Sequence, residues 1–109
     1  MSYNEKIDER VSRIVEEWNK TEKRNMFGGI CYLLKGNMLG GVYKDFLFLR
    51  LGEKGAEEAL RADHVKPFDV TGRPMKGWVM VEPEGFAEDE VLNEWLLEAK
   101  GFVETLPSQ

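Results

Sequence analysis

Few side chains in this sequence have the type and spacing that catalysis or metal binding requires. His64 is the single histidine, so no second histidine can complete a metal site or a proton-transfer pair. Cys31 is the single cysteine and lies between Ile30 and Tyr32 without a basic neighbour, which is typical of a buried cysteine rather than a nucleophile. The sequence therefore predicts no catalytic group, no metal and no cofactor, and favours a protein that is not an enzyme.

Two glycine pairs and one acidic run also lack the setting of a ligand site. A phosphate-binding loop joins a strand to a helix N-terminus, whereas Gly28-Gly29 precedes a predicted strand and Gly40-Gly41 lies inside one. Glycine within a strand instead suggests a bulge or the close approach of another group. The acidic residues between positions 82 and 90 lack the spacing of oxygen ligands for a cation, and a solvated helix start explains them.

Segment 71–77 is the best candidate for a binding site, because it puts two cations in an exposed-looking loop of an acidic protein. The alternative is an ordinary turn in which Gly72 and Pro74 set the backbone and one apolar side chain fills the core. That alternative leaves the two cations unexplained. The residues expected to form the site are Asp69, Arg73, Met75 and Lys76.

Length and charge limit the class of protein. The chain has 109 residues and a net charge of −5 at pH 7, with a pI of about 5.0, so it has the size of one domain and lacks a broad basic surface. We expect no direct nucleic-acid binding and no attachment to an anionic membrane. A signal peptide and a membrane-length apolar run are both missing from the sequence, which favours the cytoplasm.

The apolar pattern predicts an α+β fold with the order α-β-β-β-α-β-β-α, in two layers with a five-stranded antiparallel sheet. Helices are expected at residues 5–19 with Asn4 as N-cap, at 53–62, and from about 88 to a stop at Pro107. Residues 20–25 are predicted to form a loop. Residues 65–70 are predicted to be extended, and residues 77–82 to form the last strand.

Two-residue turns at Gly36-Asn37 and Lys44-Asp45 would fix the register of the first three strands. Cys31 would then lie opposite Val42. One face would be aliphatic and would pack on the first and last helices, together with Trp18 and Trp95. Its residues are Cys31, Leu33, Met38, Gly40, Val42, Leu47, Leu49 and Leu51, and the more aromatic face has Ile30, Tyr32, Leu34, Leu39, Gly41, Tyr43, Phe46, Phe48 and Arg50.

Several local strings make the chain resemble the TfoX N-terminal domain family. They are residues 26–32 (MFGGICY), 36–42 (GNMLGGV), 67–78 (PFDVTGRPMKGW), 81–85 (VEPEG) and the closing Trp95 with 102–107 (FVETLP). The resemblance implies a fold similar to a type III secretion chaperone. It also implies a relation to the TfoX, or Sxy, competence regulator, a transcriptional co-activator working with a cyclic-AMP receptor protein. We expect one such domain over residues 1–109, without the C-terminal domain of that regulator.

Three functions remain open at this point. The first is a regulatory or protein-interaction domain like the N-terminal domain of TfoX, and the second is a small-ligand-binding module that uses segment 71–77. The third, an enzyme acting on RNA or a metabolite, is disfavoured by the missing catalytic groups. We expect a homodimer or another protein partner to cover the aromatic sheet face, because such a patch suits an interface better than water. The expected interface residues are Tyr32, Tyr43, Phe46, Phe48 and Arg50.

Overall fold

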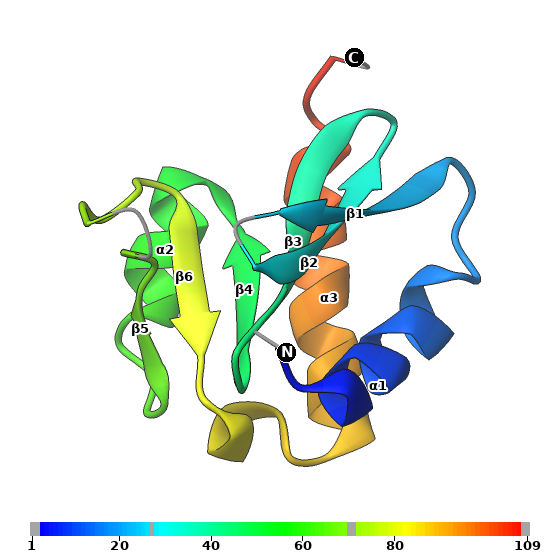
Figure 1. The fold of residues 1–109 in the computed structure, drawn as a ribbon. Helices are drawn as coiled ribbons and strands as arrows, with labels where there is room; N and C mark the ends of the chain where they lie inside the picture. The colour runs from blue at the N-terminus through cyan, green and yellow to red at the C-terminus, as the bar shows by residue number, and fades with distance from the viewer. Residues whose placement is uncertain (1–2, 27, 70–71, 108–109) are drawn as a thin grey trace.

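The computed structural model describes residues 3–26, 28–69 and 72–107 of the chain. Within them the chain forms three α-helices, one 3-10 helix and six strands, which confirms the α+β fold class (Figure 1). In chain order the elements are α1 (Glu5–Val15), β1 (Thr21–Met26), β2 (Gly29–Leu34), β3 (Asn37–Tyr43), β4 (Phe46–Arg50), α2 (Gly52–Ala59), β5 (Val65–Pro67), β6 (Trp78–Val81), η1 (Pro83–Phe86) and α3 (Asp89–Val103).

The strands form one antiparallel sheet in the order β1-β2-β3-β4-β6-β5. The strand beyond the five expected is β1, which occupies the segment predicted to be a loop. It pairs with β2 from Thr21 opposite Leu34 to Met26 opposite Gly29. An edge strand needs no alternation of apolar residues, because its side chains stay near the surface, and its charged residues discourage further strand pairing. The polar composition that argued against a strand here is therefore compatible with an edge strand.

The first hairpin turns one residue earlier than predicted. Lys35 and Gly36 occupy the turn with φ values of 52° and 84°, and Leu34 pairs directly with Asn37. Two successive positive φ values are what a type I′ turn requires. The shift of the turn alone would leave the same residues on each face of the sheet, because it moves the pairing by an even number of positions.

A β-bulge in this hairpin changes which residues face the helices. The register shifts between Tyr32 and Leu33, where β3 contains one extra residue, Leu39. Beyond the bulge, Ile30 rather than Cys31 lies opposite Val42. One inserted residue moves every following side chain of a strand to the other face. The prediction that Cys31 and Leu33 face the helices is therefore wrong, and both lie on the opposite face.

The second hairpin has the predicted register. Val42 pairs with Leu47 and Gly40 pairs with Leu49, and Lys44 at the turn has a φ of 52°. Leu47 and Leu49 are fully buried on the side that the helices cover, as expected. This strand pair therefore anchors the main core.

All three helices contribute to the core on one face of the sheet. The cluster combines side chains of α1, α2 and α3 with the inward residues of β2, β3, β4 and β6. Trp18 and Trp95 pack against it, as predicted. The buried helix residues of the cluster are Ile7, Val11, Val15, Ala56, Ala59, Leu92, Leu96, Ala99 and Val103.

A smaller aromatic cluster closes the opposite face of the sheet. Phe48 stacks on Phe68 with ring centroids 5.1 Å apart and an interplanar angle of 7°, and Trp78 lies 6.1 Å from Phe48. Phe48 has no exposed surface. The chain thus covers part of this face with the segment that follows β5 rather than with a helix, and the aromatic face is less open than the sequence suggested.

The helices are shorter than their apolar stripes predict. Asn4 caps α1 as expected, since its side-chain oxygen accepts hydrogen bonds from the N–H groups of Lys6 and Ile7. The helix ends at Val15 rather than at residue 19, and turns then lead into β1. The middle helix similarly ends at Ala59.

Candidate functional site

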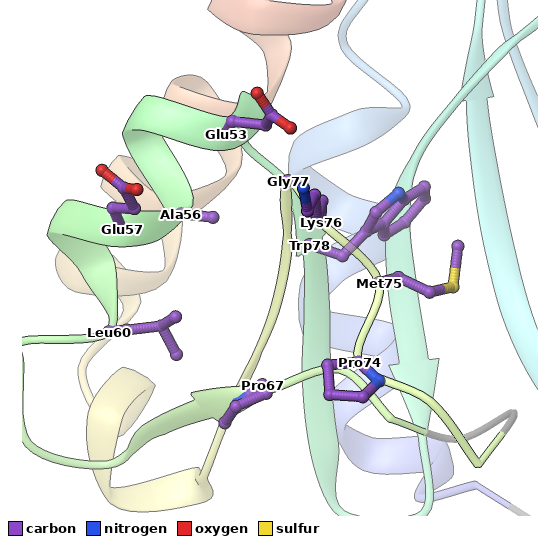
Figure 2. Close-up of a pocket in the computed structure, with 10 residues that line it drawn as sticks. All are labelled: Glu53, Ala56, Glu57, Leu60, Pro67, Pro74, Met75, Lys76, Gly77 and Trp78. Carbon is purple, nitrogen blue, oxygen red and sulfur yellow. The ribbon is translucent and has the colours of Figure 1, made fainter.

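One pocket brings together part of the predicted binding loop and the exposed side of α2 (Figure 2). It has a volume of about 360 Å³. We call it the α2–loop pocket. Its lining residues are Glu53, Ala56, Glu57, Leu60, Pro67, Pro74, Met75, Lys76, Gly77 and Trp78.

Backbone hydrogen bonds hold the two walls of the α2–loop pocket together. The carbonyl oxygen of Gly77 accepts the N–H groups of both Leu51 and Gly52, at 2.8 and 3.1 Å. Gly52 and Gly77 have φ values of 82° and 86°, a region that glycine enters without strain. At the other end of the loop, the N–H of Met75 donates to the Phe68 carbonyl at 3.0 Å. Residues 75–77 are therefore held against the start of α2 and against the aromatic cluster.

Exposed apolar side chains concentrate in the α2–loop pocket. Among the described residues, the large hydrophobic side chains that are exposed are Leu60 at 39%, Met75 at 37% and Leu97 at 46%. Two of these three line the pocket, where Pro67 and Pro74 are exposed as well. Figure 2 shows Leu60 just beyond the end of α2, pointing toward Pro67, and the Met75 side chain extending from the loop to the side away from α2. Partly exposed apolar surface at a concave site is typical of a binding pocket.

Charged groups lie at the rim of the α2–loop pocket. Glu53 and Glu57 are exposed on α2, one turn apart, and Lys76 is exposed on the loop. The ion pairs found among residues 3–26, 28–69 and 72–107 involve none of these three side chains. Their charges are therefore available to a bound molecule.

The structure divides the four residues that the sequence placed in a binding loop. Met75 and Lys76 line the α2–loop pocket. Arg73 and Asp69 are exposed but do not line it. Met75 does not fill the core, which removes that part of the simple-turn alternative.

The helix side of the pocket was missed by the sequence analysis. Ala56, Ala59 and Leu60 form a short apolar stripe at i, i+3 and i+4. The structure buries Ala56 and Ala59 but leaves Leu60 exposed just beyond the end of α2. A helix too short to bury its last apolar residue was the signal that could have indicated the site.

The predicted sheet-face interface is smaller in the structure. Tyr32 and Phe48 are buried within the chain and do not belong to an open surface. Tyr43, Phe46 and Arg50 are half-buried. The Lys66 ammonium lies 4.2 Å from the ring centroid of Phe46, which gives that ring an intramolecular cation–π contact.

A buried polar cluster links α1 to the edge strand β1. The Tyr32 hydroxyl donates to Asp8 and lies 2.6 Å from the Ser12 hydroxyl, while the Lys23 ammonium donates to Asp8 at 2.6 Å. Burial first, and then the hydrogen bond to Asp8, raises the pKa of Tyr32, so that its hydroxyl remains a donor. The evident role of this cluster is to tie β1 to the helix layer.

Neither Cys31 nor His64 has the setting of a catalytic group. Cys31 is fully buried, and burial raises its pKa to about 11, so the thiol stays protonated and inert. His64 is exposed, with Nδ1 3.7 Å from a Glu82 oxygen. In the part of the chain that the structure describes, no three histidine, cysteine or acidic side chains gather closely enough to hold a metal ion. None of the described helices is both long and apolar enough to cross a bilayer.

Comparison with protein families matches the chain to the TfoX N-terminal domain over residues 13–102. This range contains the whole sheet, α2 and every residue of the α2–loop pocket. Comparisons with curated proteins and with solved structures find no match.

Proposed function

Since this chain belongs to the TfoX N-terminal domain family, which is not a known enzyme family, we propose that it is a non-catalytic, regulatory protein-interaction domain. We place the docking site for its partner in the α2–loop pocket. The observation that carries this proposal is that each wall of one hollow includes an exposed large apolar residue, Leu60 beside α2 and Met75 on the loop. A partner side chain that enters the pocket would remove both from water, and such burial is the main favourable term in protein association.

The construction of the pocket also supports a docking role. Its walls are joined by backbone hydrogen bonds from Leu51 and Gly52 to Gly77, so binding would not have to order a free loop. A preformed site loses less conformational entropy on association than a flexible one. We also propose that the protein acts in the cytoplasm, because its composition is acidic and includes a single cysteine.

A small-ligand-binding module is the second candidate function. The volume of about 360 Å³ favours it, because small-molecule pockets begin at about 300 Å³. The two candidate functions predict different contacts between the bound molecule and the residues of the pocket. A small ligand would contact the buried lining residues Ala56 and Trp78, whereas a protein would also cover the outer side chains of Leu60 and the prolines.

The first prediction compares two equivalent changes of exposed leucines. Leu60→Ser removes an apolar wall of the α2–loop pocket, and Leu97→Ser removes the exposed leucine of α3, which does not line that pocket. Wild-type and variant proteins are immobilised, exposed to extract of the source cells and compared by quantitative mass spectrometry. We expect one or more proteins whose recovery falls about tenfold with Leu60→Ser, as for a central apolar contact, and is unchanged with Leu97→Ser.

Equal loss with both variants, or no protein sensitive to Leu60→Ser alone, would contradict the proposed docking site. Circular dichroism of both variants provides the control for folding. Neither change is expected to alter the spectrum, because both side chains are already exposed in the isolated chain.

A further inference from the structure

We infer that the α2–loop pocket takes an apolar side chain from a basic peptide segment, whose lysine or arginine residues pair with Glu53 and Glu57. The inference rests on the proposed function and adds the chemistry of the partner. It follows from how charge is distributed over the molecule and around this pocket.

The negative charge of the chain is concentrated on two helices. Helix α2 has three acidic residues and one lysine, and α3 has four acidic residues and one lysine. Together they have a net charge of −5, equal to that of the whole chain. The rest of the chain is balanced in charge. The α2–loop pocket therefore opens beside one of the two elements that make this protein acidic.

The charged residues at the rim are acidic on one wall of the pocket and basic on the opposite wall. Glu53 and Glu57 extend from the α2 wall, and Lys76 belongs to the opposite wall (Figure 2). A peptide whose apolar side chain enters the pocket beside Leu60 and Pro67 would place its basic flanks against α2. Lys76 would repel the reverse orientation, so that the rim selects both the sign of the charge and its side.

The test uses three short peptides and nuclear magnetic resonance of the intact chain. The first has a central leucine flanked on each side by a lysine one residue away, the second has glutamates in place of the lysines, and the third has serine in place of the leucine. Each peptide is titrated to millimolar concentration, and the backbone amide shifts of the protein are followed. We expect the lysine–leucine peptide to shift the amides of residues 56–60 and 75–78, with the other two peptides at least about fivefold weaker.

Matched charge variants locate the contact. The double variant Glu53→Gln/Glu57→Gln should weaken the lysine–leucine peptide about fivefold and reduce its salt dependence, because two exposed ion pairs are lost. The double variant Glu9→Gln/Glu16→Gln removes the same charge from the region of α1, away from the pocket, and should leave binding unchanged.

The outcomes separate this inference from the proposed function. If the glutamate–leucine peptide binds at the pocket as tightly as the lysine–leucine peptide, the basic partner is excluded but the docking site is not. If all leucine peptides fail to shift the pocket amides, both are contradicted. If the same amides shift with protein concentration alone, the pocket is an interface with a second copy and the basic-peptide inference is wrong.

Discussion

Replacing Gly41 with alanine should destabilise the domain by about 3 kcal/mol or more, and so remove a large part of its stability. A Cβ atom at this position would lie 1.9 Å from the carbonyl oxygen of Ile30 and 3.0 Å from the Cα of Cys31. Both neighbours are backbone of the paired strand β2, which cannot move aside without breaking the ladder. Urea unfolding followed by circular dichroism measures the loss.

The matched control is Gly101→Ala in α3. Apart from its chain neighbours and the backbone of its own helix, no heavy atom of the described chain lies within 4 Å of a Cβ built at this position. Alanine is favoured over glycine inside a helix by about 0.5–1 kcal/mol. The same substitution should therefore stabilise the chain at residue 101 and destabilise it at residue 41. Equal effects at the two sites would show that the close approach of β2 and β3 is not as described.

The second large effect is expected for Phe48→Ala, which should cost about 3–5 kcal/mol of the free energy of unfolding. Phe48 is fully buried and stacks on Phe68, so truncation would leave a cavity in the smaller cluster. Phe46→Ala, at a half-buried ring two residues away, should cost clearly less. Both values come from urea titrations. A Phe48→Ala variant that keeps its stability and instead loses self-association would restore the sheet-face interface.

The fold class could be predicted because its strongest signals are local. Asn4 at the start of α1, the Lys44-Asp45 turn and the alternation through Leu47 and Leu49 each act over a few residues, and all appear as expected. The glycines inside β3 were rightly taken as a sign of a bulge or a close approach. The structure contains both, a register shift beside Gly40 and the contact of β2 backbone at Gly41.

The register of the first hairpin could not be predicted, because neither its turn nor its bulge has a unique local signal in the sequence. Two pairs of positive-φ candidates overlap at residues 35–37, and the chain selects Lys35-Gly36. The bulge at Leu39 then exchanges the faces of β2. No local pattern distinguishes an extra residue from a regular strand when both faces are apolar. Tyr32 was consequently assigned to an interface, although it is buried beside Asp8.

Only the loop wall of the binding site could be predicted from the sequence. The cations and the methionine of segment 71–77 indicated an exposed loop, and Met75 and Lys76 do line the α2–loop pocket. The opposite wall depends on where α2 ends and on the hydrogen bonds that hold it to Gly77. These are contacts between residues far apart in the sequence, which periodicity does not encode.

Site-specific photo-crosslinking in the source cells tests the docking site most directly. A benzophenone amino acid is placed at Leu60 in the α2–loop pocket or at Leu97 outside it, in otherwise wild-type protein. We expect a discrete cross-linked partner from position 60 that is absent from position 97 and is lost when Met75→Ser is added. A partner captured from position 97 but not from position 60, or one that is indifferent to Met75→Ser, would contradict the docking site.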